Sequence, residues 1–350
     1  MVDALNLLEV AAVPITLFID EFGIVRMINP RPSDLTGFIE TTYVPTEPRP
    51  AAIELGTAKP EDRPTESTPG GWSAFGDNLF LWGGAERLDD TIDAYATASS
   101  LAPTNAPIQF RLGVAYRARH DSDQAQAGDF AKAVEHWGRA LDLNPNQYIW
   151  RRRIQQYGPR LDKPYSFYDW VNDARREIQA RGEIPRILSV EPRGAEMANP
   201  SPVFEARTEE RPDPRNQIER DSGKWIQIET AVVPAFSRRG EPVRVHVMVR
   251  PDPGGKGHWN NEGDPTVLWV DLPTGWQADH QRLTLVAPPE AVSHETRTFE
   301  FEVRPPGDAS PGEFELDAFV LYGVCEDENG TCLYRRQDTT LRIRLRGLTP

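Results

Sequence analysis

Residues 106–147 read APIQFRLGVAYRARHDSDQAQAGDFAKAVEHWGRALDLNPNQ, and this stretch decides the fold of the middle of the chain. Counted from the first residue, positions 7, 8 and 11 are Leu112, Gly113 and Tyr116. If eight residues around 120–127 are an insertion, positions 20, 24, 27 and 32 are Ala133, Trp137, Ala140 and Pro145. This spacing of small, aromatic and proline residues predicts a pair of antiparallel helices in a unit of about 34 residues.

The physical reason for the pattern is close helix packing. Gly113 and Ala133 are small enough to let two helices approach, and Tyr116 and Trp137 fill the space beside them. Pro145 cannot continue a helix and ends the second one. We therefore expect one well-formed helical pair, with Gly128 and Asp129 at the start of its second helix.

The pattern resembles the tetratricopeptide repeat family. One unit matches well (106–147), a half-matched unit precedes it (72–105), and a divergent helix follows (148–157). Stacked repeats usually need about three units, so the flanking units are expected to act as caps. An aromatic face over residues 165–182 predicts one more helix, packed on the last repeat, so the helical region spans 72–182. The resemblance implies that these helices bind a protein or peptide.

The N-terminal segment, residues 1–43, is expected to form two strands (15–19 and 24–28) and a short helix (33–40) with Ser33 as its N-cap. It resembles the second half of a thioredoxin or redoxin domain, through VAAVPITLFID at 10–20 and GIVR at 23–26. The resemblance places that family's cis-proline at Pro14, but its cysteine motif would lie before Met1. Either the chain starts inside a longer protein or the domain has decayed. The alternative is an ordinary β-hairpin with a trans proline.

Two proline-rich stretches, 44–71 and 183–223, lack an apolar period and are predicted to be linkers. Beyond Trp225 the apolar period becomes two, as in Thr298–Val303 and Thr340–Leu345. Seven strands are expected, at 225–233, 243–250, 266–271, 282–287, 296–304, 313–322 and 332–346. Seven short strands separated by Pro and Gly turns predict an immunoglobulin-like β-sandwich over 224–347. The predicted fold class is therefore a multidomain α+β chain.

The only two cysteines are Cys325 and Cys332, and the Asn329-Gly330 turn signal lies between them. A two-residue turn would place Cys332 opposite Asp327, whereas a wider loop would place the two cysteines opposite each other. A bond would close a very short loop, which makes stabilisation a weak reason for it. The residues alone leave three readings open: a structural disulfide, a labile redox pair, or two incidental thiols.

The C-terminal region resembles the N-terminal domain of the thiol:disulfide interchange protein DsbD, also called the disulfide bond corrector domain. The matching stretches are GHWNNE (257–262), PTVLWVDLPTG (265–275), and LYGVC (321–325) through Cys332. The resemblance implies an immunoglobulin-like fold and a redox pair, Cys325 and Cys332, that exchanges electrons with thioredoxin-like proteins. The chain departs from the family in a spacing one residue wider and in Leu333, where the family has proline.

Composition excludes several other classes. The formal net charge of −14 repels a phosphate backbone, so we expect no nucleic-acid partner. The six histidines are scattered without zinc-ligand spacing, and no cofactor or metal site is expected. The sequence has no membrane-spanning run and no leader as written, which predicts a cytoplasmic protein; a signal peptide before Met1 would make it periplasmic.

The resulting hypothesis is a thioredoxin-associated binding or redox-accessory protein, whose repeats recruit a protein partner and whose Cys325–Cys332 pair exchanges thiols. If it is an enzyme at all, it is a thiol-disulfide oxidoreductase without the thioredoxin active-site cysteines. Two alternatives remain: a purely structural adaptor with inert cysteines, and a truncated form of a redoxin-type oxidoreductase.

Overall fold

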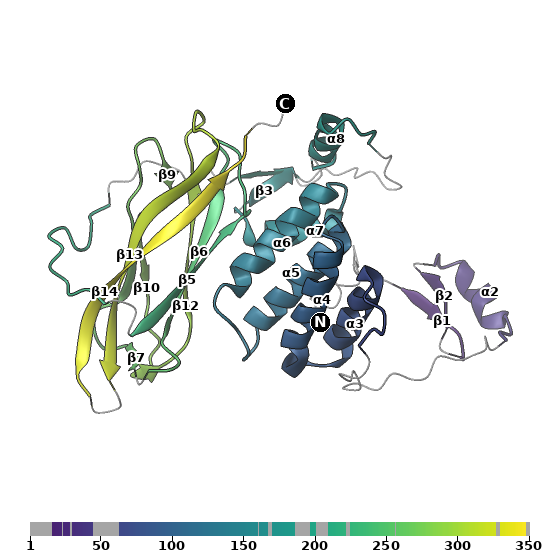
Figure 1. Cartoon of the computed structure of the whole chain (residues 1–350), viewed down its shortest axis with the longest axis horizontal. Coiled ribbons are helices and arrows are strands. Elements are labelled where there is room, and N and C mark those ends of the chain that lie inside the picture. The colour runs from purple at the N-terminus through teal and green to yellow at the C-terminus, as the bar shows by residue number, and fades with distance from the viewer. Residues whose placement is uncertain are drawn as a thin grey trace.

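A computed structural model describes residues 16–22, 24–28, 30–44, 63–159, 161–166, 170–185, 197–200, 209–221, 225–255, 257–326 and 330–347. The described chain is a mixed α+β protein with helices and several antiparallel sheets, as predicted. A small strand–strand–helix unit comes first, a block of helices follows, and a two-sheet sandwich forms the C-terminal part (Figure 1).

The N-terminal unit pairs β1 (Leu17–Ile19) antiparallel with β2 (Val25–Ile28), and α2 (Asp34–Glu40) follows. Asp20 shapes the turn between the strands, because its carboxylate accepts the amides of Phe22 and Ile24, each at 2.9 Å. Ser33 is the N-cap residue of α2, as predicted, although its side chain makes no capping hydrogen bond. Pro14 lies outside the described residues.

Five helices follow: α3 (Pro69–Trp82), α4 (Leu88–Leu101), α5 (Ala106–His120), α6 (Asp129–Leu143) and α7 (Tyr148–Tyr157). Local capping sets two of the starts. Thr68 Oγ1 accepts the amide of Gly71 at 3.1 Å, and Asn105 Oδ1 accepts the amide of Ile108 at 3.2 Å. Because Thr68 and Pro69 start α3, the predicted linker ends earlier than residue 71.

The contact between α5 and α6 is as close as the pattern of small residues predicts. A Cβ atom added to Gly113 would lie 2.6 Å from ring atoms of Trp137, which is itself fully buried. Arg119 at the end of α5 donates to Asp129 at the start of α6 with a contact of 2.6 Å, and both side chains are buried. Arg119 also bonds Asp89 of α4, so three helices meet at one guanidinium.

The segment after α7 departs from the prediction. The structure has a strand, β3 (Leu161–Ser166), before a shorter helix, α8 (Trp170–Ala180). β3 pairs with β4 (Met197–Pro200), which lies inside the stretch predicted to be a linker. The helix predicted at 165–182 therefore starts too early, because residues 165 and 166 join a strand pair with a distant partner.

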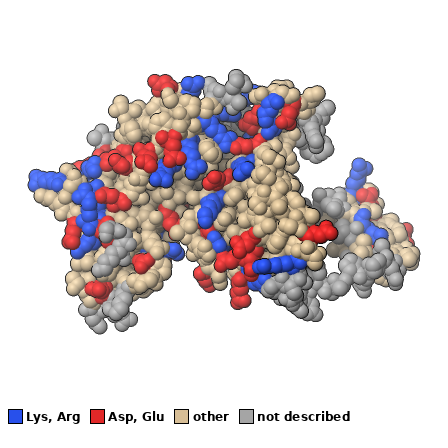
Figure 2. Space-filling view, viewed as in Figure 1, with Lys and Arg blue, Asp and Glu red and all other residues tan. Residues whose placement is uncertain are grey.

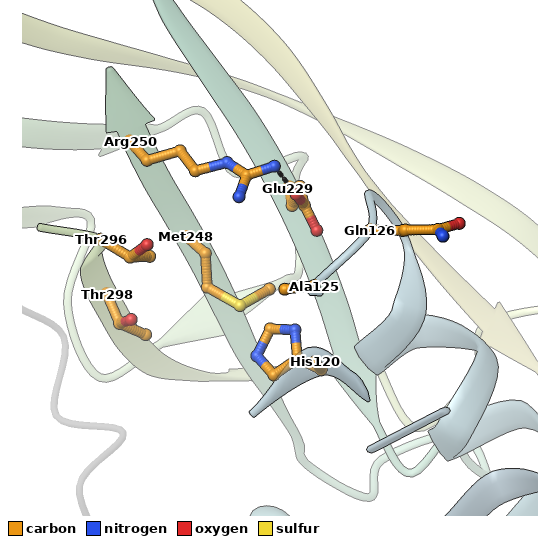
Figure 3. Close-up of a pocket in the computed structure, with 8 residues that line it drawn as sticks. All are labelled: His120, Ala125, Gln126, Glu229, Met248, Arg250, Thr296 and Thr298. Carbon is orange, nitrogen blue, oxygen red and sulfur yellow. Dashed lines mark ion pairs between the residues drawn. The ribbon is translucent and has the colours of Figure 1, made fainter. Parts of the chain in front are cut away.

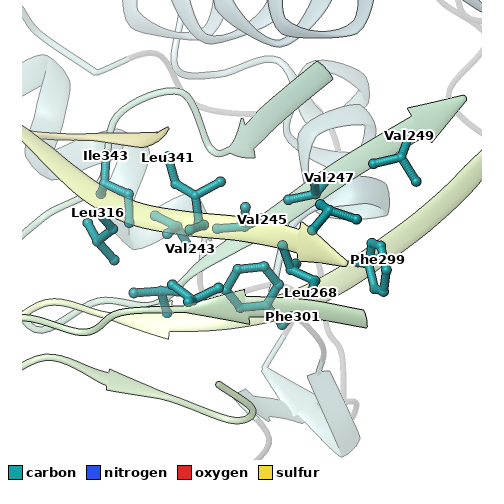
Figure 4. Packing of buried hydrophobic residues seen from close by; sticks show 14 of the residues in the cluster. Val243, Val245, Val247, Val249, Leu268, Phe299, Phe301, Leu316, Leu341 and Ile343 are labelled. Atoms are coloured by element: carbon teal, nitrogen blue, oxygen red, sulfur yellow. The ribbon is translucent and has the colours of Figure 1, made fainter. Parts of the chain in front are cut away.

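Two antiparallel sheets form the sandwich. The β6 sheet has the order β5-β6-β12-β9: β5 (Ile226–Val233), β6 (Val243–Pro251), β12 (Arg297–Arg304) and β9 (Gln277–Ala278). The β13 sheet has the order β10-β8-β13-β7-β11, with β14 also paired to β13: β10 (Arg282–Leu285), β8 (Thr266–Val270), β13 (Gly312–Glu326), β7 (Gly257–Asn260), β11 (Val292–Ser293) and β14 (Cys332–Leu345). Alternate residues of both sheets point inward and form one core, including Val245, Val247, Leu268, Phe301 and Leu341 (Figure 4).

The seven predicted strands are all present, and the structure adds β7, β9 and β11. The most consequential difference is the length of β13, which continues past Tyr322 to Glu326. The outer face of the β13 sheet carries a second, smaller cluster that includes Trp269 and Phe319, with Ile218 packed against it.

Residues 209–221 were predicted to be part of a linker, and that prediction is wrong. They lie against the outer face of the β13 sheet, where Asp213 pairs with Arg336 at 3.0 Å and both side chains are buried. Asp221 accepts the hydroxyl of Tyr322 at 2.7 Å. Polar side chains hold this segment in place, so its composition resembles that of a linker.

The helical block docks on the outer face of the β6 sheet. Phe130, Trp137 and Trp150 share one buried cluster with Ala231, Val233 and Met248 of β5 and β6. His246 donates Nε2–H to the carbonyl of Tyr157 at 2.8 Å, and Phe130 lies edge-on against its ring. The helices therefore cover one sheet of the sandwich, and the β13 sheet faces the opposite side (Figure 1).

Candidate functional site

The two cysteines are brought together at the end of a hairpin. Cys325 is the second-last residue of β13, and Cys332 is the first residue of β14. The two cysteines are direct partners in the strand ladder, and their Cα atoms are 3.9 Å apart. Their sulfur atoms form a disulfide of 1.99 Å. The ladder runs through Gly323 and Val324 to Cys325 without a break in register, so Cys325 is opposite Cys332. This pairing agrees with the wider loop and excludes the two-residue turn.

The two sulfur-bearing residues differ in their surroundings. Cys325 is 5% exposed, because β14 flanks it on one side and β7 on the other. Cys332 is exposed and lies on β14, at the edge of the sheet. Along the free edge of β14, backbone hydrogen bonds to other described residues are made by Arg336, Arg344 and Arg346. These bonds lie away from Cys332. A thiolate from another molecule can therefore approach Cys332 much more easily than Cys325.

The disulfide lies on the outer face of the β13 sheet. Val324 and Tyr322 point into the core, so Cys325, which alternates with them, points outward. His258 of β7 is the direct ladder partner of Cys325 on the other side, and it is 7% exposed. The next row of this face contains Gly323 opposite Tyr334, and burial raises the pKa of the Tyr334 phenol.

A second feature is a cavity of about 250 Å³ at the junction of the helices and the β6 sheet (Figure 3). The end of α5, the α5–α6 connection and three strands line it: His120, Ala125, Gln126, Glu229, Met248, Arg250, Thr296 and Thr298. Glu229 accepts the amide of Gly128 at 3.1 Å and faces Arg250 at 3.6 Å. Burial, together with Arg117, lowers the pKa of His120. The volume is below the range of about 300–1,000 Å³ usual for ligand sites, and the charged lining groups pair with each other. We interpret the cavity as part of the junction.

Sequence reasoning found the two cysteines but missed His258 as their neighbour. The residues of β7 carry no period-two pattern that would have predicted a strand, so nothing placed His258 beside Cys325. Among the described residues, no group of three or more His, Cys, Asp and Glu side chains could hold a metal ion. No described helix is long and apolar enough to cross a membrane. Acidic and basic side chains are interspersed on the face of the molecule shown in Figure 2.

Comparison with known proteins gave no family model and no curated protein that matches this chain. Among solved structures, a protein of unknown function from Porphyromonas gingivalis W83 is 15% identical, with a TM-score of 0.22, over 34% of this chain and 47% of its own. The sporulation control protein Spo0M from Bacillus subtilis is 15% identical, with a TM-score of 0.19, over 35% of this chain and 50% of its own. The chain thus spans about half the length of these two proteins.

A third solved structure matches more of the chain. The alkylpurine DNA glycosylase AlkC from Pseudomonas fluorescens is 12% identical, with a TM-score of 0.20, over 80% of this chain and 75% of its own. TM-scores this low indicate neither a shared fold nor a shared function for any of the three proteins.

Proposed function

We propose that this chain is a redox-accessory protein, in which Cys325–Cys332 exchanges thiols with a thioredoxin-like protein and the helices recruit a protein or peptide partner. The observation that carries the proposal is the asymmetry of the disulfide: Cys332 is exposed at a sheet edge and Cys325 is buried. Exchange begins when a thiolate attacks one of the two sulfur atoms of the disulfide. Because Cys332 is accessible and Cys325 is shielded, the first mixed disulfide is expected on Cys332.

The closed loop is short, so the stabilisation that the disulfide can give is at the lower end of the usual range. The cysteines are seven residues apart, and the chain-entropy contribution of so short a loop is about 2.5 kcal/mol, against about 4.7 kcal/mol for a hundred-residue loop. Strand pairing also holds Cys325 on both sides, with β14 on one side and β7 on the other. The disulfide therefore links two residues that the strand ladder already places opposite each other.

The resemblances of the sequence support the same proposal. Residues 224–347 resemble the DsbD N-terminal domain, and two antiparallel sheets packed face to face are compatible with its immunoglobulin-like fold. Residues 106–147 resemble a tetratricopeptide unit, and α5 and α6 are compatible with its helical pair. In this proposal the helices supply a binding surface and the hairpin supplies the chemistry.

A trapping experiment tests the proposal. A thioredoxin that lacks its resolving cysteine is mixed with the oxidised protein, and the mixed disulfide is mapped by mass spectrometry after glutamyl endopeptidase digestion. Cleavage after Glu326 or Glu328 separates the two cysteines. We expect the thioredoxin on Cys332, with Cys325 as a free thiol.

The controls are Cys332→Ser, which should abolish trapping, and a small monothiol at equal concentration, which should react more slowly than thioredoxin. Trapping on Cys325 would contradict the access argument. If thioredoxin reacts no faster than the monothiol, the chain is better explained as an adaptor with an inert disulfide.

A further inference from the structure

The exposed disulfide has a run of carboxylates next to it in the chain. Residues 326–328, directly after Cys325, read Glu-Asp-Glu. Consecutive Cα atoms are about 3.8 Å apart, so covalent geometry alone keeps the Cα atoms of these three residues within about 12 Å of that of Cys325. Glu326 is exposed, and among the described residues no ion pair involves its side chain. Its full negative charge therefore acts on whatever approaches the disulfide.

The connection between β7 and β8 adds two more carboxylates, Glu262 and Asp264. Both are exposed, and neither forms an ion pair with another described residue. Burial and the carboxylate of Asp264 together raise the pKa of the Tyr334 phenol. Tyr334 follows Cys332 by two residues on β14, so it shares the outer face of the sheet with the disulfide. Asp264 therefore acts on the same face that a partner of the disulfide has to approach.

Cations are fewer at this end of the sandwich. Arg335 is paired with Glu219 at 3.0 Å, so its charge is balanced. Arg282 on β10 opposes Asp264 at the Tyr334 phenol, and no ion pair joins it to another described residue. Lys256, directly before β7 in the sequence, adds one more positive charge. Five carboxylates against these two cations leave an excess of three negative charges.

We propose that the partner of the Cys325–Cys332 disulfide attacks with a thiol that is set in a basic surface; this inference rests on the proposed exchange function. The attacking group is a thiolate and is itself an anion. Carboxylates beside Cys332 repel a thiolate in acidic surroundings, whereas lysine or arginine side chains around the thiol are attracted to them. The charges thus select basic partners among the proteins that reach the exposed sulfur.

The selection acts on the first step of exchange. The partner's thiolate attacks Sγ of Cys332, the disulfide bond breaks, and its electron pair leaves on Sγ of Cys325, which takes up a proton from solvent. The partner's second thiolate then attacks the mixed disulfide and releases Cys332, so two electrons pass from the partner's dithiol to the cysteine pair. At about 8 Å in water one pair of unit charges changes a rate about twofold, and three carboxylates together change it about eightfold.

Two synthetic peptides test the inference. Each carries one cysteine, flanked by lysines in one peptide and by glutamates in the other, and mass spectrometry follows mixed-disulfide formation with the oxidised protein at low salt. The ratio of the two rates is compared between the wild type and the triple variant Glu326→Gln, Asp327→Asn, Glu328→Gln, so the intrinsic reactivity of each peptide cancels. We expect the wild type to favour the lysine peptide, and the triple variant to lower the ratio at least about tenfold.

The matched control removes three carboxylates from the helical block, in the triple variant Glu86→Gln, Asp123→Asn, Glu135→Gln. All three side chains are exposed, and their block covers the β6 sheet, away from the disulfide. The net charge changes by the same amount, and the ratio should stay within about twofold of the wild type. In 1 M salt, where the Debye length is about 3 Å, the wild-type ratio should fall towards that of the first variant.

The outcomes separate this inference from the proposed function. Equal ratios in the wild type and the Glu326–Glu328 variant at low salt would overturn the inference, and so would an equal effect of the control variant. In either case a protein that still reacts with thioredoxin keeps its exchange function. Failure of the wild type to react with both peptides and with thioredoxin would instead refute the exchange function itself.

Discussion

Replacing Gly113 with alanine should destabilise the protein, although alanine is the better helix former. The added Cβ would lie 2.6 Å from two ring atoms of Trp137 and 2.9 Å from the carbonyl oxygen of Ala133. Trp137 is fully buried, so its ring cannot move without displacing other core side chains. Overpacking of this kind costs about 1–3 kcal/mol. The higher helix propensity of alanine stabilises the folded state by about 1 kcal/mol.

The net expectation is a loss of roughly 1 kcal/mol in the free energy of unfolding, the difference between these two effects. Gly138→Ala on α6 is the matched control, because among the described residues its Cβ would meet only Ala235, at 3.9 Å. That substitution should gain about 0.5–1 kcal/mol from helix propensity alone. Urea unfolding followed by far-ultraviolet circular dichroism measures both variants. If Gly113→Ala stabilises the protein as much as Gly138→Ala does, close contact between α5 and α6 is not what requires glycine.

Three further substitutions test the charged and titrating groups of the helices. Asp129→Ala should cost about 3 kcal/mol of stability in the same urea assay, because it leaves the buried Arg119 without its main partner; Asp89→Ala, at the 57% exposed side chain, should cost less than about 1 kcal/mol. Burial lowers the pKa of His136 from 6.5 to about 4, so the unfolded chain takes up this proton first and stability falls as the pH drops from 6.5 towards 4. His136→Gln should lose less stability than the wild type between pH 7 and pH 5, and equal losses would show that this residue does not set the pH dependence.

The helical block could be predicted from the sequence because its information is local. Gly113 lies on α5, Trp137 lies on α6 and Pro145 follows α6, so the pattern is contained within one pair of helices. The long strands were predictable for the same reason, since alternation at Thr298–Val303 needs no knowledge of the partner strand. Strands of two residues, such as β9 and β11, carry no such pattern.

The parts that could not be predicted depend on distant partners. Asp213 reads as a residue of a polar linker, and only its pairing with Arg336, 123 residues away, shows that its segment belongs to the sandwich. The candidate site divides in the same way. The cysteines could be named from the sequence, but their direct opposition required β13 to continue to Glu326, and the place of His258 required a strand that the sequence did not predict.

The docking of the helices on the β6 sheet restricts what one partner can touch. The disulfide is on the outer face of the β13 sheet, and the two sheets of a sandwich are about 10 Å apart before their outer side chains are added. A short peptide held by the helices against the far sheet would not reach Cys332. If one partner uses both of the proposed surfaces, it has to be large enough to extend around the sandwich; if it is not, the proposal requires two different partners.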